Sequence, residues 1–439
     1  MKLLGNMAIE QQELTIAGIR ASELVQTYGS PLYVVDQKDL TDRIQTFVTH
    51  FSSEKFQTNI VYASKAFTNL YMAQIVAREG LSLDVVSGGE LYTAIEAGVD
   101  PAKIYFHGNN KLPSELEEAV AAGVGTFVVD NDYEFTWLQE IAEAEGRRIR
   151  VLLRVNPGIE AHTHEYIQTT NHDSKFGVSI FDKQTIPFVE QMHHSEWLDF
   201  AGFHCHIGSQ VFEAESFFKE ASEMLAYAKK VEEELGIELN EINLGGGFGV
   251  YYTAEDQPFE LATFLAQYIQ HIETTMEELG IHPEVISIEP GRSLINNSGS
   301  TLYTIGGIKE TIVGHPYLFV DGGMTDNPRP ITYQAKYDAA IATRMKEPIH
   351  QTYRVAGKCC ESGDVLIKEV DLPKAAPGDL LVIPSTGAYN YSMSSNYNRI
   401  PRPAVVFVEN GEARVAVKRE TYADLLRNDM RMEGGTHVI

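Results

Sequence analysis

The sequence predicts an α/β protein, in which a TIM (β/α)8 barrel is followed by a mostly β C-terminal domain. Short β-rich runs alternate with longer amphipathic stretches from residue 57 onward, and eight such units fill roughly 250 residues, which is typical of a TIM barrel. After about residue 298 strand-like runs follow one another with little helix, which predicts the second domain. A doubly wound open sheet stays possible, because alternation alone does not show closure.

The runs expected to form barrel strands are rich in β-branched and aromatic residues. They are NIVYAS (59–64), LSLDVV (81–86), KIYFHG (103–108), TFVVD (126–130), RVLLRVN (150–156), FAGFHCHIG (200–208), EINLGG (241–246) and EVISIEP (284–290). Amphipathic segments such as 134–146 and 218–236 are expected as connecting helices, and a further helix at about 37–50 precedes the first strand. We therefore expect the barrel at 37–298.

The second domain, a β-sandwich or small barrel, is expected at 299–439. Its strand-like runs are TLYTIGGIKETIV (301–313), PYLFVD (316–321), TYRVAG (352–357), DVLIKEVDL (364–372), DLLVIP (379–384), AVVFVEN (404–410) and ARVAVKRE (413–420). Residues 1–36, which include the alternating run LTIAGI (14–19), are expected to complete this domain.

The amino-acid composition argues against two kinds of binding partner, nucleic acids and membranes. The formal net charge is −26, with 61 acidic and 35 basic residues, so nucleic acid is not expected as a partner. Membrane association is not expected either, since no run approaches the roughly 20 apolar residues of a membrane helix. Three cysteines (Cys205, Cys359 and Cys360) cannot build a disulfide framework, which favours a reducing cytoplasm.

Every expected barrel strand ends in polar residues or glycines, and TIM barrels carry their chemistry at these strand ends. In chain order these residues are Lys65; Asp84; His107 and Asn109; Asp130 and Asn131; Arg154 and Asn156; His204 and His206; GGGFG (245–249); and EPGR (289–292). The carboxyl ends of the strands are therefore expected to form the functional face.

Lys65 lies in an otherwise apolar stretch, and a desolvated lysine there has a lowered pKa and can form a Schiff base. A snorkelling or salt-bridged lysine is the alternative for Lys65 considered alone. The loop 245–249 can cradle a phosphate, or by itself can equally be a tight turn, and 289–292 adds a second anion-friendly turn with a carboxylate. A lysine, a phosphate cradle and a carboxylate are what pyridoxal 5′-phosphate (PLP) requires, so PLP is the expected cofactor.

His204 and His206 are two residues apart on an expected strand, so they should point to the same face. One imidazole could stack on a flat cofactor ring, or both could be ordinary hydrogen-bonded histidines. The competing functional interpretation is a metal-dependent barrel hydrolase, because this spacing also suits zinc. That hydrolase would need further ligands, so no metal is expected.

A set of motifs in order along the chain resembles the diaminopimelate decarboxylases, members of the fold type III, alanine-racemase-like PLP enzymes. The motifs are YASKA (62–66), DVVSGGEL (84–91), SKFG (174–177), GFHCHIGSQ (202–210), NLGGGFG (243–249), EPGRS (289–293), DGGMTDNPRP (321–330), CCESGD (359–364) and GAYNYSM (387–393). The resemblance runs from about residue 30 to 410 and implies a homodimer with shared active sites.

The resemblance also implies roles by position. Lys65 would bind PLP covalently, His206 would stack on its ring, Glu289 would pair with its pyridine nitrogen, and Cys360 would be catalytic. The remaining cofactor contacts would be Asp84, Arg154, Ser209, Gly245, Gly246, Gly247, Gly291, Arg292 and Tyr389. Cys360 and Glu361 would enter from the partner subunit.

The implied reaction is decarboxylation of meso-2,6-diaminopimelate to L-lysine and CO2, the last step of lysine biosynthesis. Arg292, Arg329, Tyr333, Glu361 and Tyr389 are the expected substrate contacts; a substrate without a distal carboxylate would gain nothing from Arg329. A related decarboxylase for a D-amino acid or a carrier-tethered glutamate is the alternative, and a non-catalytic regulatory homologue would be expected to lack Lys65 or Cys360. Cys360 and Lys65 both stay candidates for the final proton donor.

The family usually has a glycine at the position of Asn171. The loop 167–177 is therefore expected to differ in shape.

Overall fold

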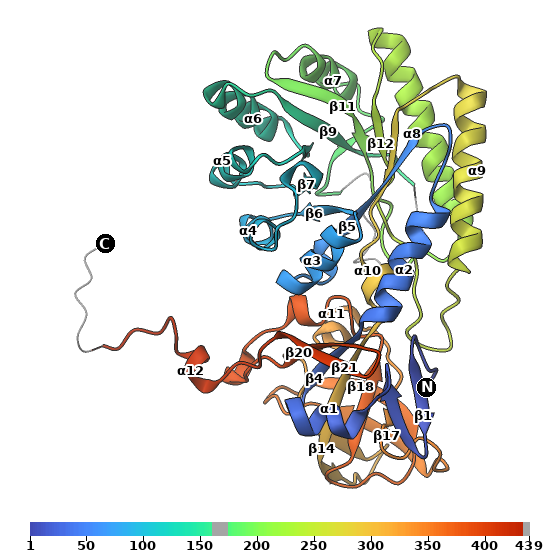
Figure 1. Ribbon diagram of the computed structural model, residues 1–439, viewed down its shortest axis with the longest axis vertical. Helices are drawn as coiled ribbons and strands as arrows, with labels where there is room; N and C mark the ends of the chain where they lie inside the picture. Colours follow the sequence, from blue (N-terminus) through green and yellow to red (C-terminus); the bar gives the residue numbers. More distant parts are fainter. Residues whose placement is uncertain (160–173, 433–439) are drawn as a thin grey trace. The chain divides into compact units, whose positions relative to one another are not determined.

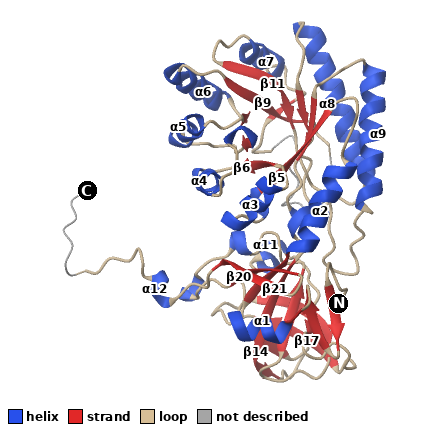
Figure 2. Cartoon of the chain, in the orientation of Figure 1, coloured by secondary structure: helices blue, strands red, loops and turns tan. Residues whose placement is uncertain are grey.

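The structure is a computed structural model that describes residues 1–159 and 174–432. The chain forms two compact units, one of Leu40–Asn296 and one that combines Met1–Asp39 with Asn297–Ile439 (Figure 1). Each has its own strands and helices (Figure 2). Within the described residues, every helix is too short or too polar to cross a membrane.

Eight parallel strands of the first unit close into a barrel. They are β5 (Gln57–Ala63), β6 (Ser82–Val85), β7 (Ile104–Phe106), β8 (Thr126–Val129), β9 (Ile149–Asn156), β11 (Leu198–His204), β12 (Glu241–Asn243) and β13 (Val285–Ile288). Each strand pairs with the next in this order, and β13 pairs back onto β5, for example Ile288 beside Ile60. The predicted barrel is therefore confirmed, and the open-sheet alternative is wrong. A short strand, β10 (Val178–Ser179), adds to the edge of β9.

One helix precedes the first barrel strand and the others follow barrel strands, and they lie outside the barrel (Figure 1). They are α2 (Gln37–His50), α3 (Leu70–Arg78), α4 (Gly88–Glu96), α5 (Pro113–Ala122), α6 (Asp132–Glu145), α7 (Thr185–His193), α8 (Ala214–Leu235), α9 (Leu261–Leu279) and α10 (Arg292–Ile295), with 3-10 turns at Ser64–Ala66 and Pro101–Lys103. Three of these helices begin after a residue whose side chain caps the first turn. Asn69, Ser87 and Asn131 accept a hydrogen bond from a backbone N–H of α3, α4 and α6, respectively. The helix expected at 37–50 matches α2.

Seven of the eight barrel strands end one to four residues earlier than expected, and the largest differences are at β11 and β12. The strand expected over 241–246 stops at Asn243, because Gly245 takes a left-handed backbone conformation with φ +60° that a strand cannot contain. The strand expected over 200–208 stops at His204. His206 therefore lies in the loop after β11, and the strand argument that placed it beside His204 does not apply.

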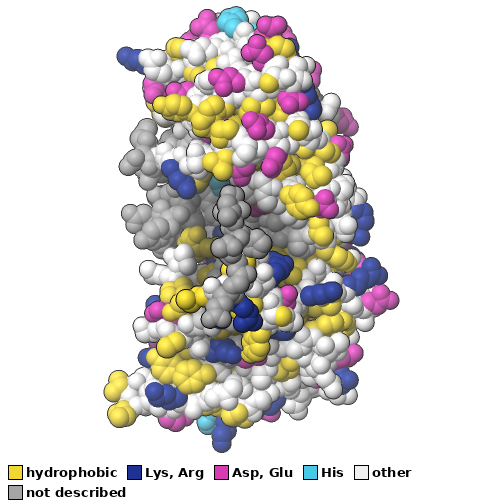
Figure 3. All heavy atoms as spheres, turned by 90° about the vertical axis from the view of Figure 1, so that its left-hand side faces the viewer, with side chains coloured by type: hydrophobic (Ala, Val, Ile, Leu, Met, Phe, Trp, Pro, Cys, Tyr) yellow, Lys and Arg dark blue, Asp and Glu magenta, His cyan; other side chains and the backbone are white. Residues whose placement is uncertain are grey.

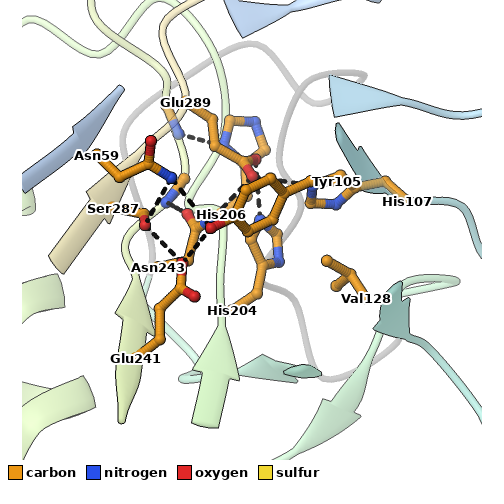
Figure 4. A network of polar contacts seen from close by, with 12 residues as sticks. Asn59, Tyr105, His107, Val128, His204, His206, Glu241, Asn243, Ser287 and Glu289 are labelled. Atoms are coloured by element: carbon orange, nitrogen blue, oxygen red, sulfur yellow. Dashed lines mark hydrogen bonds and ion pairs between the residues drawn. The ribbon is translucent and has the colours of Figure 1, made fainter. Parts of the chain in front are cut away.

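A polar cluster fills the barrel interior where β12 begins (Figure 4). The Tyr105 hydroxyl donates to Glu241 Oε1 over 2.9 Å, and the Ser287 hydroxyl donates to the same oxygen over 2.6 Å. Asn59 Nδ2 donates to the Tyr105 oxygen over 3.0 Å, and Arg150 pairs with Glu241 Oε2 at 3.1 Å. The Glu241 carboxylate is only 1% exposed, and burying a charge without partners costs free energy. These hydrogen bonds and the ion pair offset that cost.

The second unit is built on a sheet of nine strands. Its strands are β4 (Leu32–Asp36), β14 (Gly299–Lys309), β15 (Tyr317–Val320), β16 (Ala340–Ile341), β17 (Gln351–Ala356), β18 (Val365–Leu372), β19 (Leu380–Pro384), β20 (Ala404–Glu409) and β21 (Glu412–Val417). The main path runs β18-β17-β15-β14-β4-β20-β21, with β19 also pairing β14 and β16. Its short helices are α1 (Ala21–Tyr28), α11 (Arg329–Tyr333) and α12 (Tyr422–Leu425), with 3-10 turns at Tyr391–Met393 and Tyr397–Arg399.

The N-terminal segment joins this unit differently from the prediction. The run 14–19 lies in a separate three-stranded sheet of β1 (Met7–Glu10), β2 (Glu13–Ile16) and β3 (Ile19–Arg20). Its apolar side chains share a buried core with residues of β14 and β20, including Leu302 and Val406. The segment in the large sheet is instead β4, an apolar run that the sequence interpretation did not assign. The strand expected over 301–313 ends at Lys309, and Ile312 and Val313 are exposed.

Charged side chains are scattered over the face of the molecule drawn in Figure 3. Most of the acidic groups in this view are in its upper half and most of the basic groups in its lower half, and the acidic groups do not form one continuous patch.

Candidate active site

Glu289 occupies the centre of a buried polar network at the carboxyl ends of the barrel strands (Figure 4). It directly follows β13 and is 8% exposed. His204 Nε2 lies 3.0 Å from Glu289 Oε2, and His107 Nε2 lies 2.9 Å from Glu289 Oε1. Asn243 Nδ2 donates to Oε1 over 2.9 Å. Three different strands or strand ends thus supply nitrogen atoms to one carboxylate.

This network favours an ionised Glu289 beside a neutral His204. Burial alone would raise the pKa of Glu289, but attraction and hydrogen bonds from His107 and His204 outweigh it and hold that pKa well below its usual range. Burial lowers the pKa of His204 to about 4, against the pull of Glu289. A neutral imidazole that donates from Nε2 is consistent with both directions.

Asp84 and Lys65 lie at the ends of the two neighbouring strands, β6 and β5. Asp84 is buried, and its Oδ1 has no hydrogen-bond partner within the described residues. Burial, assisted by the charge of Glu289, raises the pKa of Asp84 to about 7, although His107 and Lys65 act in the opposite direction. Lys65 is exposed, so the desolvated lysine expected from its apolar flanks is wrong: Ala63, Ala66 and Phe67 are buried while the lysine side chain is not.

The glycine loop after β12 packs closely against two neighbouring strand ends. A Cβ atom on Gly245 would lie 2.3 Å from the Cys205 carbonyl oxygen, and one on Gly246 would lie 2.2 Å from the Glu289 carbonyl oxygen. The Gly245 amide donates to Asn243 Oδ1 over 2.9 Å, and the Gly246 amide donates to His206 Nδ1 over 3.2 Å. Only glycine fits both positions, and the loop fixes the tautomer of His206.

His206 is half-buried beside this loop. Burial and the positive charges of Lys65 and Arg154 lower the pKa of His206 well below its usual value. A neutral ring with its Nδ1 used by the Gly246 amide has the shape and charge needed to pack against a flat cofactor.

Arg292 begins the short helix after β13 and is held by two hydroxyl groups. Its Nε and Nη2 atoms donate to Ser209 Oγ over 3.2 and 3.0 Å, and Nη1 donates to the Tyr252 hydroxyl. Tyr252 also contacts Asn296 through its hydroxyl at 3.0 Å. The predicted pair Ser209 and Arg292 is thus brought together, and Tyr252 is a partner that the sequence interpretation missed.

Arg154, on β9, is linked to the segment 174–177. Its guanidinium carbon lies 4.3 Å from the centre of the Phe176 ring, and the Gly177 amide donates to Asp130 Oδ1 over 2.6 Å. The atypical position Asn171 lies outside the described residues, so the prediction about the shape of that loop stays a prediction.

The remaining predicted residues belong to the second unit. The buried guanidinium of Arg329 lies 5.9 Å from the Tyr333 ring and 6.0 Å from the Tyr389 ring, so these three form one group. Tyr389 itself has φ +62°, a strained value for a tyrosine. Cys360 and Glu361 are exposed, and the Cys360 amide donates to Asn398 Oδ1 over 2.8 Å.

Within the barrel, the structure places the other predicted residues at the carboxyl ends of the strands. These are Lys65, Asp84, Arg154, His206, Ser209, Gly245, Gly246, Gly247, Glu289, Gly291 and Arg292. Sequence reasoning noted His107 and His204 as polar strand-end residues but gave neither a role beside Glu289. Asn243 was missed as well; its signal is its place two residues before the glycine loop, on the same face of β12 as Glu241.

The histidine pair proposed as metal ligands is not the pair that the structure brings together. Within the described residues, the group with metal-ligand geometry is His107, His204 and Glu289, without His206. His204 Nε2 is hydrogen-bonded to Glu289 at 3.0 Å, whereas His107 Nε2 lies 2.9 Å from Glu289 without hydrogen-bond geometry.

The residues present suit PLP. Lys65 offers an accessible primary amine, and the close-packed glycine loop offers a rigid cradle beside Ser209 and Arg292. Glu289 offers a fixed carboxylate for a protonated ring nitrogen. The uncommitted oxygen of Asp84 adds an acceptor beside Lys65.

Comparison with known proteins gives one consistent family. Residues 37–296 match the family model described as pyridoxal-dependent decarboxylase, pyridoxal binding domain. The chain is 47% identical to the diaminopimelate decarboxylase of Bacillus subtilis over 422 residues, which cover 96% of each protein. It is 46% identical to that of Halalkalibacterium halodurans, over 95% of each.

Solved structures agree with this result. The crystal structure of a diaminopimelate decarboxylase from M. jannaschii in complex with L-lysine is 32% identical, with a TM-score of 0.90 over 98% of this chain and 99% of that one. The Helicobacter pylori enzyme with L-lysine is also 32% identical, with a TM-score of 0.85 over 92% of this chain and 98% of that one.

Proposed function

This chain belongs to the diaminopimelate decarboxylase family of PLP-dependent enzymes, and we propose how its residues carry out the family's reaction. The reaction is decarboxylation of meso-2,6-diaminopimelate to L-lysine and CO2, the last step of lysine biosynthesis. The observation that carries the proposed roles is the buried Glu289 carboxylate, which is contacted by three side-chain nitrogens at the end of β13, the strand that pairs with β5.

Bound PLP supplies an electron sink for the bond that breaks between the substrate's α-carbon and its carboxyl group. Lys65 would hold the cofactor covalently and be displaced by the substrate amine. Glu289 would keep a proton on the pyridine nitrogen, because a fixed carboxylate next to that nitrogen favours its charged form. His206, neutral and oriented by the Gly246 amide, would pack on the ring.

The cofactor phosphate would be bound by the glycine loop together with Ser209, Gly291 and Arg292. Arg292 is already oriented by its bonds to Ser209 and Tyr252, so little side-chain entropy is lost on binding an anion. Tyr389 would close the phosphate site with its hydroxyl. Asp84 and Arg154 would lie near the cofactor ring, where Asp84 has an oxygen to accept a hydrogen bond.

After CO2 leaves, the α-carbon must gain a proton, so each turnover consumes one proton from a nearby acid. Cys360 and Lys65 are the two candidates. Cys360 is an exposed free cysteine in a loop fixed by the bond of its amide to Asn398. Lys65 would offer its free amine once the substrate had taken its place on the cofactor.

Substrate selection would depend on the second unit. Diaminopimelate carries a distal ammonium and carboxylate, and we assign the carboxylate to Arg329 and Arg292 with Tyr333, and the ammonium to Glu361. The buried Arg329 guanidinium lies 5.9 and 6.0 Å from the centres of the Tyr333 and Tyr389 rings, and its planar donors suit a forked contact to a carboxylate. D-Lysine and D-ornithine lack a distal carboxylate.

Release of CO2 by the purified, PLP-loaded protein tests the substrate. We expect rapid release from meso-diaminopimelate with lysine as the product, and at most about 1% of that rate from L-lysine, D-lysine or L-ornithine. A higher rate on one of the other amino acids would contradict the roles assigned to Arg329 and Glu361. A yellow, PLP-bound protein inactive on all four would contradict the assigned reaction and point to a tethered substrate or a regulatory role.

We further propose that the protein acts as a homodimer in which Cys360 and Glu361 complete the partner's active site. Their exposure on a loop of the second unit supports this arrangement. Mixed Lys65→Ala and Cys360→Ala chains, each inactive alone, are expected to recover up to about one quarter of the wild-type activity, because half of the molecules are heterodimers with one intact site. Equal refolded mixtures that stay inactive while forming heterodimers would contradict the shared site.

A cytoplasmic location agrees with the cysteines, since all three are unpaired and Cys205 and Cys359 are buried. Alkylation of Cys360 in intact cells by a permeant maleimide, but not by an impermeant one, would support it.

A further inference from the structure

The buried carboxylate of Glu289 is contacted by nitrogen atoms of three side chains, two of which are histidines. His204 comes from the end of β11, His107 from the residue after β7, and Asn243 from the end of β12 (Figure 4). Both carboxylate oxygens are contacted: Oε2 is hydrogen-bonded to His204, and Oε1 accepts from Asn243 and lies 2.9 Å from His107 Nε2 in a charge contact without hydrogen-bond geometry. The carboxylate plane is therefore fixed from the side of the barrel interior.

The two imidazole rings support each other. Their centres are 4.7 Å apart at an angle of 69°, an edge-to-face arrangement that prevents either ring from rotating without moving the other. His204 is 1% exposed, and its Nδ1 has no hydrogen-bond partner within the described residues. A protonated His204 would leave a buried N–H without an acceptor, so its neutral form, with the proton on Nε2, is favoured.

A second buried group, centred on Lys111, fixes the turn that follows His107. Lys111, fully buried, donates to the carbonyl oxygens of Gly108 and Val128 over 2.8 and 2.7 Å and to Glu134 over 2.6 Å. All three of its N–H donors are used, and they attach the turn after His107 to β8 and α6. This attachment explains how a residue beyond the end of β7 keeps a fixed position in the barrel.

We propose that His107 and His204 are positioning residues, which hold Glu289 as a carboxylate in one orientation so that it keeps the cofactor's pyridine nitrogen protonated. The proposal rests on the role assigned to Glu289 above. It assigns function to two histidines for which the proposed reaction has no direct use. Asp84 and Arg154 are the other charged groups that act on this cluster, and both stay in place in the variants below.

The test compares variants that remove or keep the N–H donor. His204→Leu and His107→Leu remove it, whereas His204→Gln keeps a side-chain N–H at a similar distance from the backbone. We expect each leucine variant to lower kcat by about 10- to 100-fold and to change KM by less than about 3-fold. Replacing a residue that orients a metal ligand lowers activity by a similar factor. His204→Gln should recover most of the loss.

A spectroscopic readout separates positioning from mere stability. In the leucine variants, the pH midpoint for the change in visible absorbance of the bound cofactor should shift by about one unit or more, because Glu289 holds the ring proton less firmly. His271→Leu is the matched control, since His271 also bonds a hydroxyl and a carbonyl, of Ser222 and Phe218, but lies on α9. It should leave kcat per bound cofactor and the midpoint unchanged, and thermal unfolding reports the fold of every variant.

A double-mutant cycle decides whether the histidines act through Glu289. In a Glu289→Gln background, His204→Leu should cause no further loss beyond about 2-fold. The same 10- to 100-fold loss in both backgrounds, or an unshifted absorbance midpoint in a folded His204→Leu holoenzyme, would overturn the proposal. Full activity of Glu289→Gln alone would instead overturn the role of Glu289 and, with it, this inference.

Discussion

Replacement of Lys65 by alanine should lower kcat by at least about 10³-fold, which is ~4 kcal/mol of transition-state stabilisation. Lys65 is the middle residue of the 3-10 turn after β5 and is exposed, and its charge acts on the pKa values of neighbouring Asp84 and His206. Without the amine, the protein loses the covalent attachment of PLP and the group that exchanges with the substrate. The measurement is CO2 release at saturating meso-diaminopimelate and PLP.

Lys103→Ala is the matched control for this experiment. Lys103 is also a lysine next to a barrel strand, but it precedes β7 instead of following a strand. Its amine donates to the Gly80 carbonyl oxygen over 3.0 Å in an exposed position. We expect this variant to keep activity within about 2-fold of wild type. A Lys65→Ala protein that keeps more than a tenth of the wild-type kcat would refute the assignment of Lys65.

Replacement of Glu289 by glutamine should lower kcat by about 10²- to 10³-fold, with little change in the amount of folded protein. The loss of one fixed charge that acts only as charge develops in the transition state has effects of this size. Glutamine keeps the shape and can still accept from His204 or His107, but it cannot stabilise a positive pyridine nitrogen. Steady-state kinetics together with the visible spectrum of the bound cofactor measure the effect.

Glu241→Gln provides the comparison for Glu289→Gln. Glu241 is as buried as Glu289 and also bonds to three partners, but they are Tyr105, Ser287 and Arg150 in the barrel interior. This variant should lower the melting temperature and leave kcat within about 3-fold. If Glu241→Gln reduced kcat as much as Glu289→Gln, general damage to the barrel would explain both results.

The barrel could be predicted because its signals are local. Each strand is a short run of β-branched and aromatic residues, and amphipathic helices such as α8 follow the strands. The strand β4 escaped prediction because its five buried residues carry no alternation: it lies inside a large sheet, buried along its whole length. The end of β12 was placed too late, since the run EINLGG looks extended and only the left-handed conformation of Gly245 ends it.

Part of the site could be predicted because its residues follow from the positions of the strand ends. Residues at the ends of parallel strands must meet, so Lys65, Asp84, His206 and Glu289 could be grouped from their positions alone. The partners of Glu289 could not, because which of several polar strand-end residues turns toward it depends on ring orientation and loop anchoring. His107 is an example: its position depends on the buried Lys111 and Glu134, which read as ordinary surface charges in the sequence.

The most direct measurement of the central claim is to locate the bound cofactor on the chain. Borohydride reduction of the PLP-loaded protein fixes the cofactor to the lysine that holds it, and peptide mass spectrometry then identifies that lysine. The account predicts one pyridoxyl group per chain, on the peptide that contains Lys65. Attachment at any other lysine, or a protein that binds PLP without any reducible linkage, would contradict it.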